Sequence, residues 1–115
     1  MVKFGTRGEL VTCDMWLKEM PSTDELCGVI EVALMDAKIN VVNFYEHEFE
    51  VQGATLVWVL SESHCIVHSY PEHKYISIDM YTCGEEGSAT TCMDYIQLSL
   101  KVADSKIKSY PRGVN

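Results

Sequence analysis

The chain has 115 residues and a mass of 13.0 kDa, and hydrophobic residues make up 47% of it, so we expect one compact domain over residues 1–115. A formal charge of −8, with no patch of Lys or Arg, argues against nucleic acid or an anionic membrane as a partner. Five scattered cysteines without close pairs favour a reducing, cytoplasmic compartment. The sequence contains no signal-peptide pattern and no apolar run long enough to span a membrane.

The first 60 residues predict a strand, a helix and two further strands. Ser22 is followed three residues later by Glu25, and this spacing is typical of a capping box at the start of a helix. Apolar residues then recur at helical spacing. The expected elements are a strand within residues 1–13, a helix from 22 to about 38, and strands at 41–49 and 55–60, the last a continuous apolar run suited to the middle of a sheet.

Two alternating runs on either side of Pro71 predict a β-hairpin with strands at 64–70 and 74–83. Because side chains alternate along a strand, each run gathers its polar and ionisable residues on one face. A helix at 88–102 and a short edge strand at 107–110 follow. The shared faces are His64, Ile66, His68 and Tyr70 on the first hairpin strand, and Ser77, Asp79, Tyr81 and Cys83 on the second.

Hairpin strands with two intervening helices predict an α+β fold. The expected architecture is a two-layer sandwich, in which one antiparallel sheet carries both helices on one face. The other face would then carry the polar hairpin residues. A site and a subunit contact are therefore expected on that second face.

Several short motifs occur in a specific order within residues 45–84. They are Ser-Glu-Ser-His at 61–64, His68 four residues further on, Tyr-Pro-Glu at 70–72, and Thr-Cys-Gly at 82–84. In this order and spacing the chain resembles the S-adenosylmethionine decarboxylase proenzymes of the short prokaryotic, pyruvoyl-dependent kind. The resemblance also implies the two-layer sandwich already expected, and a homodimer with active sites at its interface.

The resemblance implies self-cleavage between Glu62 and Ser63. The Ser63 hydroxyl would attack the Glu62 carbonyl, and elimination from the resulting ester would give a β chain of residues 1–62 and an α chain of 63–115. Ser63 would thereby become a pyruvoyl cofactor that condenses with the substrate amine as a Schiff base and draws electrons from the bond to the carboxylate. The implied activity is decarboxylation of S-adenosylmethionine, which supplies the aminopropyl donor for spermidine.

Three more residues match the family's processing and catalytic positions. His68 would move protons during self-cleavage, and Thr55 stands where the family has a serine that supports it. Cys83 would be the proton donor after decarboxylation, since a thiol has a tunable pKa. On residue type alone, Ser63 is an ordinary turn residue, His68 a hydrogen-bonded strand histidine and Cys83 a small buried hydrophobe. The other cysteines are assigned to that structural class.

The resemblance places the adenosine part of the substrate against Phe49, Tyr70 and Glu72. Phe49 and Tyr70 would stack on adenine, although the family usually has tryptophan at the position of Tyr70. Glu72 would accept hydrogen bonds from the ribose diol. Without the resemblance, Glu72 is a solvated turn residue.

Two alternatives remain open at this point. The same scaffold could decarboxylate arginine or ornithine, because pocket residues alone can change a substrate. The chain could also be an uncleaved, non-catalytic homologue. A metal site is not expected, because His64 and His68 lie four residues apart on one strand, where Cα atoms are roughly 13 Å apart.

Overall fold

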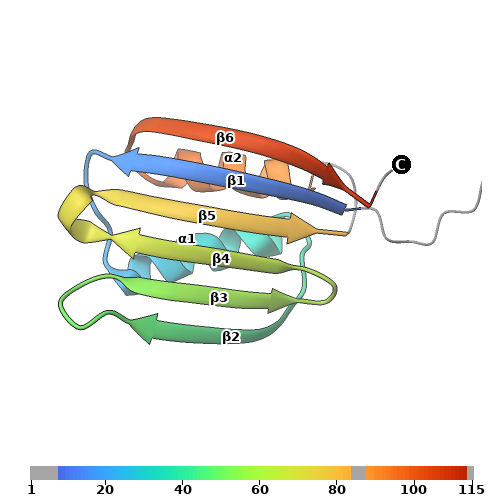
Figure 1. Cartoon of the computed structure of the whole chain (residues 1–115), viewed down its shortest axis with the longest axis horizontal. Coiled ribbons are helices and arrows are strands. Elements are labelled where there is room, and N and C mark those ends of the chain that lie inside the picture. The colour runs from blue at the N-terminus through green and yellow to red at the C-terminus, as the bar shows by residue number, and fades with distance from the viewer. Residues whose placement is uncertain (1–7, 84–87, 114–115) are drawn as a thin grey trace, which may run out of the picture.

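The computed structural model describes residues 8–83 and 88–113, which form a six-stranded antiparallel sheet and two α-helices (Figure 1). The elements are β1 (Gly8–Leu17), α1 (Thr23–Asp36), β2 (Val41–Glu48), β3 (Ala54–Leu60), β4 (His64–Tyr70), a 3₁₀ turn (Pro71–His73), β5 (Tyr75–Thr82), α2 (Ser88–Ser99) and β6 (Val102–Arg112). The strand order is β2-β3-β4-β5-β1-β6, so β1 lies between two strands that come much later in the chain.

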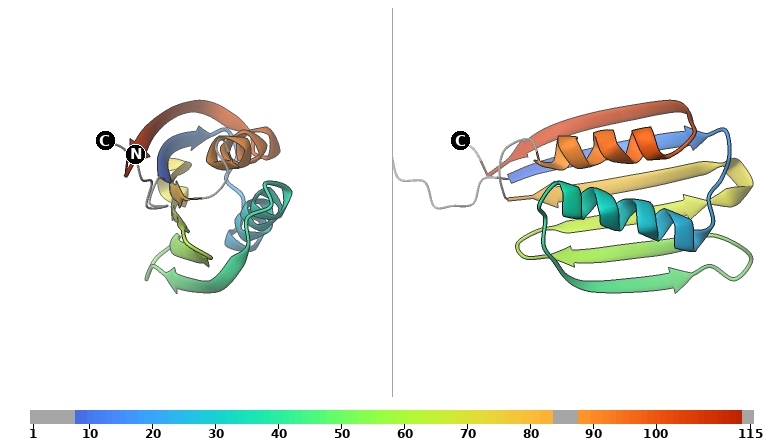
Figure 2. Two further views of the ribbon diagram at one scale, coloured as in Figure 1. Left: turned by 90° about the vertical axis from the view of Figure 1, so that its right-hand side faces the viewer. Right: turned by 180° about the vertical axis from the view of Figure 1, so that it is seen from behind.

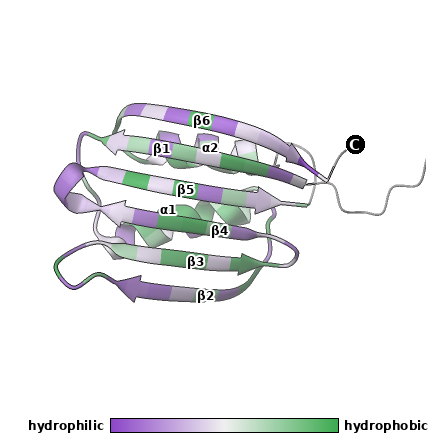
Figure 3. Ribbon diagram, in the orientation of Figure 1, coloured by the Kyte–Doolittle hydropathy of each residue, from purple (hydrophilic) through white to green (hydrophobic). Residues whose placement is uncertain are grey.

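Both helices pack on the same face of the sheet, which gives the predicted α+β two-layer sandwich (Figure 2). Buried and half-buried residues alternate along β1, β3, β4 and β5, because every second side chain points into the helix layer. Figure 3 shows hydrophobic segments in β1, β3 and β4, whereas the edge strand β2 is mostly hydrophilic. Neither described helix is long and apolar enough to cross a membrane.

Trp58 lies at the centre of the core and anchors the sheet to α1. Its side chain is fully buried, and its ring packs against Phe44 with centroids 4.9 Å apart. The indole N–H donates to Glu31 of α1 over 3.2 Å, so the one polar atom of this side chain has a partner. Burial of a side chain of this size contributes roughly 3 kcal/mol or more.

The capping box predicted at the start of α1 is present. The Ser22 hydroxyl accepts a hydrogen bond from the Glu25 amide over 3.1 Å, and the Ser22 amide donates to the Glu25 carboxylate over 2.9 Å. The helix ends at Asp36, two residues before the predicted position. Lys38 then adopts a left-handed conformation with φ 60°, and the chain turns into β2.

The predicted bounds of three elements were wrong. β1 continues to Leu17 instead of ending near Cys13, and α2 ends at Ser99 rather than at 102. β6 covers Val102–Arg112 instead of 107–110, because it pairs with the whole of β1. The sequence did not indicate this length, since most side chains of β6 are exposed and show no apolar alternation. The part of the predicted first strand that falls within residues 1–7 lies outside the described residues.

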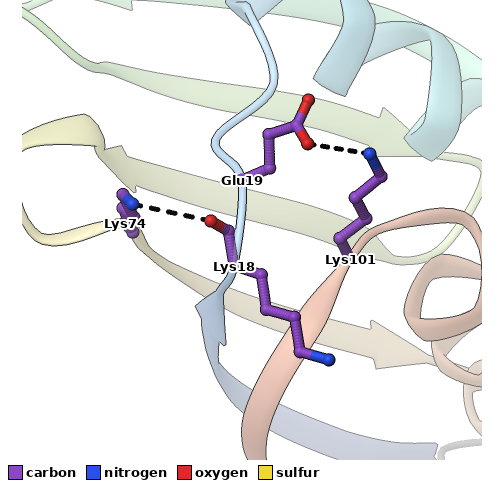
Figure 4. Close-up of polar contacts among 4 residues, drawn as sticks. All are labelled: Lys18, Glu19, Lys74 and Lys101. Atoms are coloured by element: carbon purple, nitrogen blue, oxygen red, sulfur yellow. Dashed lines mark hydrogen bonds and ion pairs between the residues drawn. The ribbon is translucent and has the colours of Figure 1, made fainter.

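Charged side chains join the loops at the end of the sheet where β1 and β4 finish (Figure 4). Lys101 forms an ion pair with Glu19 over 2.7 Å, and the Lys74 ammonium donates to the Lys18 carbonyl over 3.5 Å. All of these residues are exposed. Exposed pairs contribute little to stability, so this end of the sheet depends on strand pairing.

Candidate functional site

The Glu62–Ser63 bond lies in a tight turn between β3 and β4, at the opposite end of the sheet from Figure 4. The Leu60 amide donates to the Ser63 carbonyl over 3.0 Å, and this bond closes the turn. The Ser61 amide donates to the Asn40 carbonyl over 3.3 Å, which ties the turn to the segment after α1. Glu62 is exposed and Ser63 is half-buried. The peptide bond between them is therefore held in place and accessible.

Ser63 lies beside Cys83, twenty residues further along the chain. The Cys83 amide donates to the Ser63 hydroxyl oxygen over 3.1 Å. This bond fixes the oxygen and leaves the hydroxyl proton available to a base. Gly84, the last residue of the Thr-Cys-Gly motif, lies outside the described residues.

A cavity of about 270 Å³ opens beside this pair. It lies between the end of the sheet and the adjoining ends of the two helices, so it is bounded by segments from four parts of the chain. The lining residues are Ala37, Lys38, Ile39, Asn40, Leu60, Ser61, Glu62, Ser63, Thr82, Cys83 and Ser88.

Thr55 and His68 form a second polar pair, on the face of the sheet that the helices leave uncovered. They lie directly opposite each other on β3 and β4, and the Thr55 hydroxyl is 2.9 Å from Nδ1 of His68. Both side chains are half-buried. No second hydrogen bond of the His68 ring, through Nε2, is found among residues 8–83 and 88–113.

Aromatic side chains form a row at the far end of the same face. Phe49 contacts Tyr70 with ring centroids 5.9 Å apart, and Tyr70 stacks on Tyr75 at 5.7 Å. The row continues from Tyr75 to Trp16 at 5.4 Å. The Tyr75 hydroxyl donates to the Asp14 carboxylate, and burial, followed by this bond, raises the pKa of Tyr75 to about 12.

The sequence did not predict Tyr75, Trp16 or Asp14 as neighbours of Tyr70. The signal was present in the alternation of β1, which places Asp14 and Trp16 on the uncovered face once the strand is continued to Leu17.

Phe49 and Tyr70 contact each other directly, with their rings inclined by 40°. A flat ligand held between the two rings would have to separate them.

Glu72 is exposed in the 3₁₀ turn that follows Tyr70. Gly53 allows the β2–β3 connection to approach this turn closely, because its φ is 93° and an added β-carbon would lie 2.4 Å from the Ser69 carbonyl oxygen. Phe49 is thereby brought to within contact of Tyr70. Glu72, Phe49 and Tyr70 are therefore neighbours at one end of the sheet.

Within one chain, the predicted site residues do not all meet. Ser63 and His68 are five residues apart along β4, a Cα separation of roughly 16 Å, and Ser63 and Tyr70 are separated by roughly 23 Å. Ser63 and Cys83 form one group, Thr55 and His68 a second, and the Phe49–Tyr70–Glu72 cluster a third. A nucleoside with a short amino-acid arm cannot reach from the first group to the third.

The four remaining cysteines have ionisation properties unlike those of a reactive thiol. Burial raises the pKa of Cys13 and Cys27 to about 11 and that of Cys92 to about 12, and it raises the pKa of Cys65 still more strongly. These thiols stay protonated at neutral pH. No group of His, Cys, Asp and Glu among residues 8–83 and 88–113 has the arrangement of a metal site.

The fold and the arrangement of these groups define an α+β sandwich with ionisable side chains on its uncovered sheet face and at one end of the sheet. A family model described as S-adenosylmethionine decarboxylase matches residues 8–113. The chain belongs to this enzyme family.

Individual relatives agree with this assignment. S-adenosylmethionine decarboxylase proenzyme 2 of Halalkalibacterium halodurans is 34% identical over 112 residues, which covers 95% of this chain and 88% of the relative. The proenzyme of Bacillus cytotoxicus is 36% identical over 115 residues, covering 94% and 85%. Among solved structures, the adenosylmethionine decarboxylase from Aquifex aeolicus matches with a TM-score of 0.84 and 26% identity, covering 94% of this chain and 92% of that one.

Proposed function

We propose that the chain is a proenzyme that cleaves itself between Glu62 and Ser63 and then decarboxylates S-adenosylmethionine. The observation that carries this proposal is the hydrogen bond from the Cys83 amide to the Ser63 hydroxyl oxygen, in a turn that exposes Glu62. The nucleophile is thus held next to the bond it would attack and next to the thiol that would act later. Such positioning removes much of the entropic barrier to an intramolecular reaction.

The cleavage chemistry uses groups of this chain alone. Attack of the Ser63 oxygen on the Glu62 carbonyl carbon forms an ester and breaks the peptide C–N bond. Loss of the Ser63 α-proton then breaks the ester C–O bond and releases Glu62 as a carboxylate at the end of residues 1–62. Hydrolysis of the remaining enamine with one water expels ammonia and leaves the pyruvoyl group on the 63–115 fragment.

An intact-mass spectrum of purified protein tests this proposal. The two fragments should together weigh one water more and one ammonia less than the precursor, whereas ordinary proteolysis adds one whole water. Ser63→Ala should remain one chain, and Ser61→Ala, in the same turn, should still be cleaved. Cleavage of Ser63→Ala at the same bond would contradict the proposal.

The residues around Ser63 fit a pyruvoyl group. Ser63 is half-buried, Cys83 lies beside it, and the adjoining cavity offers space for an amino-acid substrate. The pyruvoyl group would supply the electron sink for loss of carbon dioxide. Cys83 would give its proton to the carbon that loses the carboxylate, and the reaction belongs in a cytoplasm that keeps this thiol reduced.

A homodimer would bring the separated groups together. His68 is too far from Ser63 of the same chain to exchange a proton with it, so a second copy would have to supply it. The uncovered face presents half-buried side chains from β1, β3, β4 and β5, and both described helices, α1 and α2, lie on the opposite face. Face-to-face packing of two sheets would place Thr55 and His68 of one copy near Ser63 of the other.

Substrate choice is tested by carbon dioxide release. Processed protein should release labelled carbon dioxide from carboxyl-labelled S-adenosylmethionine, and not from arginine or ornithine, because neither amino acid offers an adenine for Phe49 and Tyr70 or a diol for Glu72. The product would be the aminopropyl donor for spermidine synthesis. Release from arginine or ornithine alone would favour the alternative decarboxylase, which the family comparisons do not favour.

A further inference from the structure

The two candidate adenine-binding rings, Phe49 and Tyr70, are supported unequally by their surroundings. Their centroids are 5.9 Å apart, so an adenine that enters between them must displace one of the two. The ring that moves will be the one whose displacement breaks fewer favourable contacts. The neighbours behind each ring therefore decide how the site opens.

Tyr70 is backed by Tyr75. The two residues lie directly opposite each other on β4 and β5, and their rings stack with centroids 5.7 Å apart and planes inclined by 22°. The connection between them is a single 3₁₀ turn, closed by a hydrogen bond from the Lys74 amide to the Pro71 carbonyl over 3.1 Å. Tyr70 thus has a ring behind it and a short, closed turn after it.

Tyr75 is in turn held by side chains of β1. Its hydroxyl donates to the Asp14 carboxylate, and its ring lies 5.4 Å from that of Trp16 between centroids. Burial, followed by the bond to Asp14, raises the pKa of Tyr75 to about 12, so the hydroxyl remains a donor at neutral pH. The Lys106 ammonium of β6 lies over the Trp16 ring at 5.9 Å from its centroid. Contacts from β1, reinforced from β6, hold Tyr75 against Tyr70.

Phe49 occupies a less constrained place. It follows the edge strand β2, in a short loop closed by a hydrogen bond from its own amide to the Gly53 carbonyl over 2.9 Å. The ring of His47, which is exposed, approaches it at 6.2 Å between centroids and is inclined by 60°. An edge strand is paired on one side only, so Phe49 can move at a smaller cost than Tyr70.

We propose that Tyr75 is a positioning residue for the adenosine site, because it holds Tyr70 as a rigid wall. A bound adenine then makes room by displacing Phe49. Asp14 and Trp16 contribute by fixing Tyr75. The inference rests on the proposed function, in which Phe49 and Tyr70 stack on adenine. A wall that is already in place loses little conformational freedom on binding, so Tyr75 should affect affinity and not the chemical step.

Kinetics of processed enzyme give the first test. Tyr75→Leu removes the ring behind Tyr70, and it should raise KM for S-adenosylmethionine roughly 5-fold with kcat nearly unchanged. Tyr75→Phe keeps the ring and loses only the bond to Asp14, so KM should rise about 2-fold. Tyr95→Leu and Tyr95→Phe are the matched controls, since Tyr95 is a half-buried tyrosine in the helix layer, and they should leave KM unchanged.

A double-mutant cycle shows whether Tyr75 acts through Tyr70. Once Tyr70→Ala has removed the wall, adding Tyr75→Leu should change KM by less than about 2-fold, because no ring is left to support. In a Phe49→Ala background, Tyr75→Leu should still raise KM roughly 5-fold. An unchanged KM in Tyr75→Leu alone would overturn the inference. So would an equal rise with and without the Tyr70 ring, because Tyr75 would then act by another route.

The contribution of Asp14 is tested in the same way. Asp14→Leu and Tyr75→Phe break the same hydrogen bond, so each should raise KM about 2-fold, and the combined variant should be no worse than either one. Asp14→Asn keeps an oxygen that can accept from the phenol, and it should restore most of the affinity. Fully additive effects of Asp14→Leu and Tyr75→Phe would contradict the role given to Asp14.

A crystal structure of processed enzyme with 5′-methylthioadenosine shows which ring moves. The centroid distance from Tyr70 to Tyr75 should stay near 5.7 Å. The distance from Phe49 to Tyr70 should open from 5.9 Å to about 7 Å, because adenine needs about 3.5 Å on each side. Phe49 in its present place, with Tyr70 and Tyr75 displaced, would overturn the inference.

Two outcomes separate the role of Tyr75 from the proposed function. If Phe49→Ala and Tyr70→Ala raise KM but Tyr75→Leu does not, adenine stacking stands and the role of Tyr75 is refuted. If none of the three variants raises KM and the nucleoside binds away from the rings, adenine stacking at this end is refuted, and the role of Tyr75 is refuted with it.

Discussion

The two ends of the sheet differ in chemistry. At one end, Ser63 and Cys83 lie beside a cavity and are joined through a backbone hydrogen bond. At the other, Phe49 and Tyr70 belong to a row of contacting rings. The candidate nucleophile Ser63 lies at the first end, and the two candidate adenine-binding rings lie at the second. This difference is the reason for proposing a homodimer in which each site takes residues from both copies.

A complementation experiment tests whether residues from the two ends act together in one site. Ser63→Ala and His68→Ala should each be almost uncleaved alone, since each lacks one half of the proton-transfer pair. When the two are co-expressed with distinct tags, the His68→Ala chain should be cleaved, because its partner supplies the histidine. The losses for the single variants should be on the order of 100- to 10,000-fold in cleavage rate.

Two outcomes of that experiment carry different meanings. Cleavage of the His68→Ala chain only in the mixture supports a site shared between copies. Rapid cleavage of the His68→Ala chain by itself would remove His68 from the processing machinery. Intact mass of each tagged chain measures both.

Cys83→Ala tests whether Cys83, beside Ser63, is the proton donor after decarboxylation. The variant should be cleaved normally, and carbon dioxide release should then fall on the order of 100- to 10,000-fold, because a positioned acid is lost. Cys27→Ala is the control, since burial raises the pKa of Cys27 to about 11 and keeps it protonated. Unchanged turnover in fully processed Cys83→Ala would return Cys83 to the structural class.

Substitutions at the aromatic end should change substrate binding more than cleavage. Phe49→Ala should raise KM for S-adenosylmethionine roughly 5-fold or more, because stacking of a ring contributes about 1 kcal/mol beyond simple burial. Tyr70→Trp should keep or lower KM by offering a larger ring. Equal KM values for all three proteins would exclude adenine stacking at this end.

The smallest expected effect concerns Thr55, which contacts His68. Thr55→Ser keeps the hydroxyl and frees its rotamer, so cleavage should accelerate by about 2-fold. Thr55→Val removes the hydroxyl while keeping the shape, and cleavage should slow. A time course of fragment formation by mass spectrometry compares the three chains, and a faster Thr55→Val chain would contradict a supporting role for the hydroxyl.

The sequence predicted those features that local patterns determine. The capping box of α1 and the alternation of β4 are confirmed, because a helix start and a half-buried strand each leave a periodic or spaced signal. The length of β6 was missed because its side chains are mostly exposed, so only its pairing with β1 reveals it.

The candidate site was predictable only in part, for a similar reason. The motifs identified Ser63, Cys83 and His68 as candidate site residues. They did not show that Ser63 and His68 lie far apart in one chain, which follows from the extended strand β4 between them. Tyr81 has no motif, and the close approach of its ring to Gly8 joins two strands that are remote in sequence. Contacts of this kind follow from the register of non-sequential strands, which local periodicity does not determine.

The place of β1 in the sheet has a consequence for the two-chain protein that cleavage would produce. β1 belongs to residues 1–62, yet it lies between β5 and β6, both of which belong to 63–115, while β3 of the first fragment pairs with β4 of the second. The fragments are therefore interleaved, and neither can leave without breaking the sheet. Once unfolded, they would have to find each other by diffusion, so recovery of the cut protein should depend on its concentration, whereas refolding of the uncut chain is an intramolecular process.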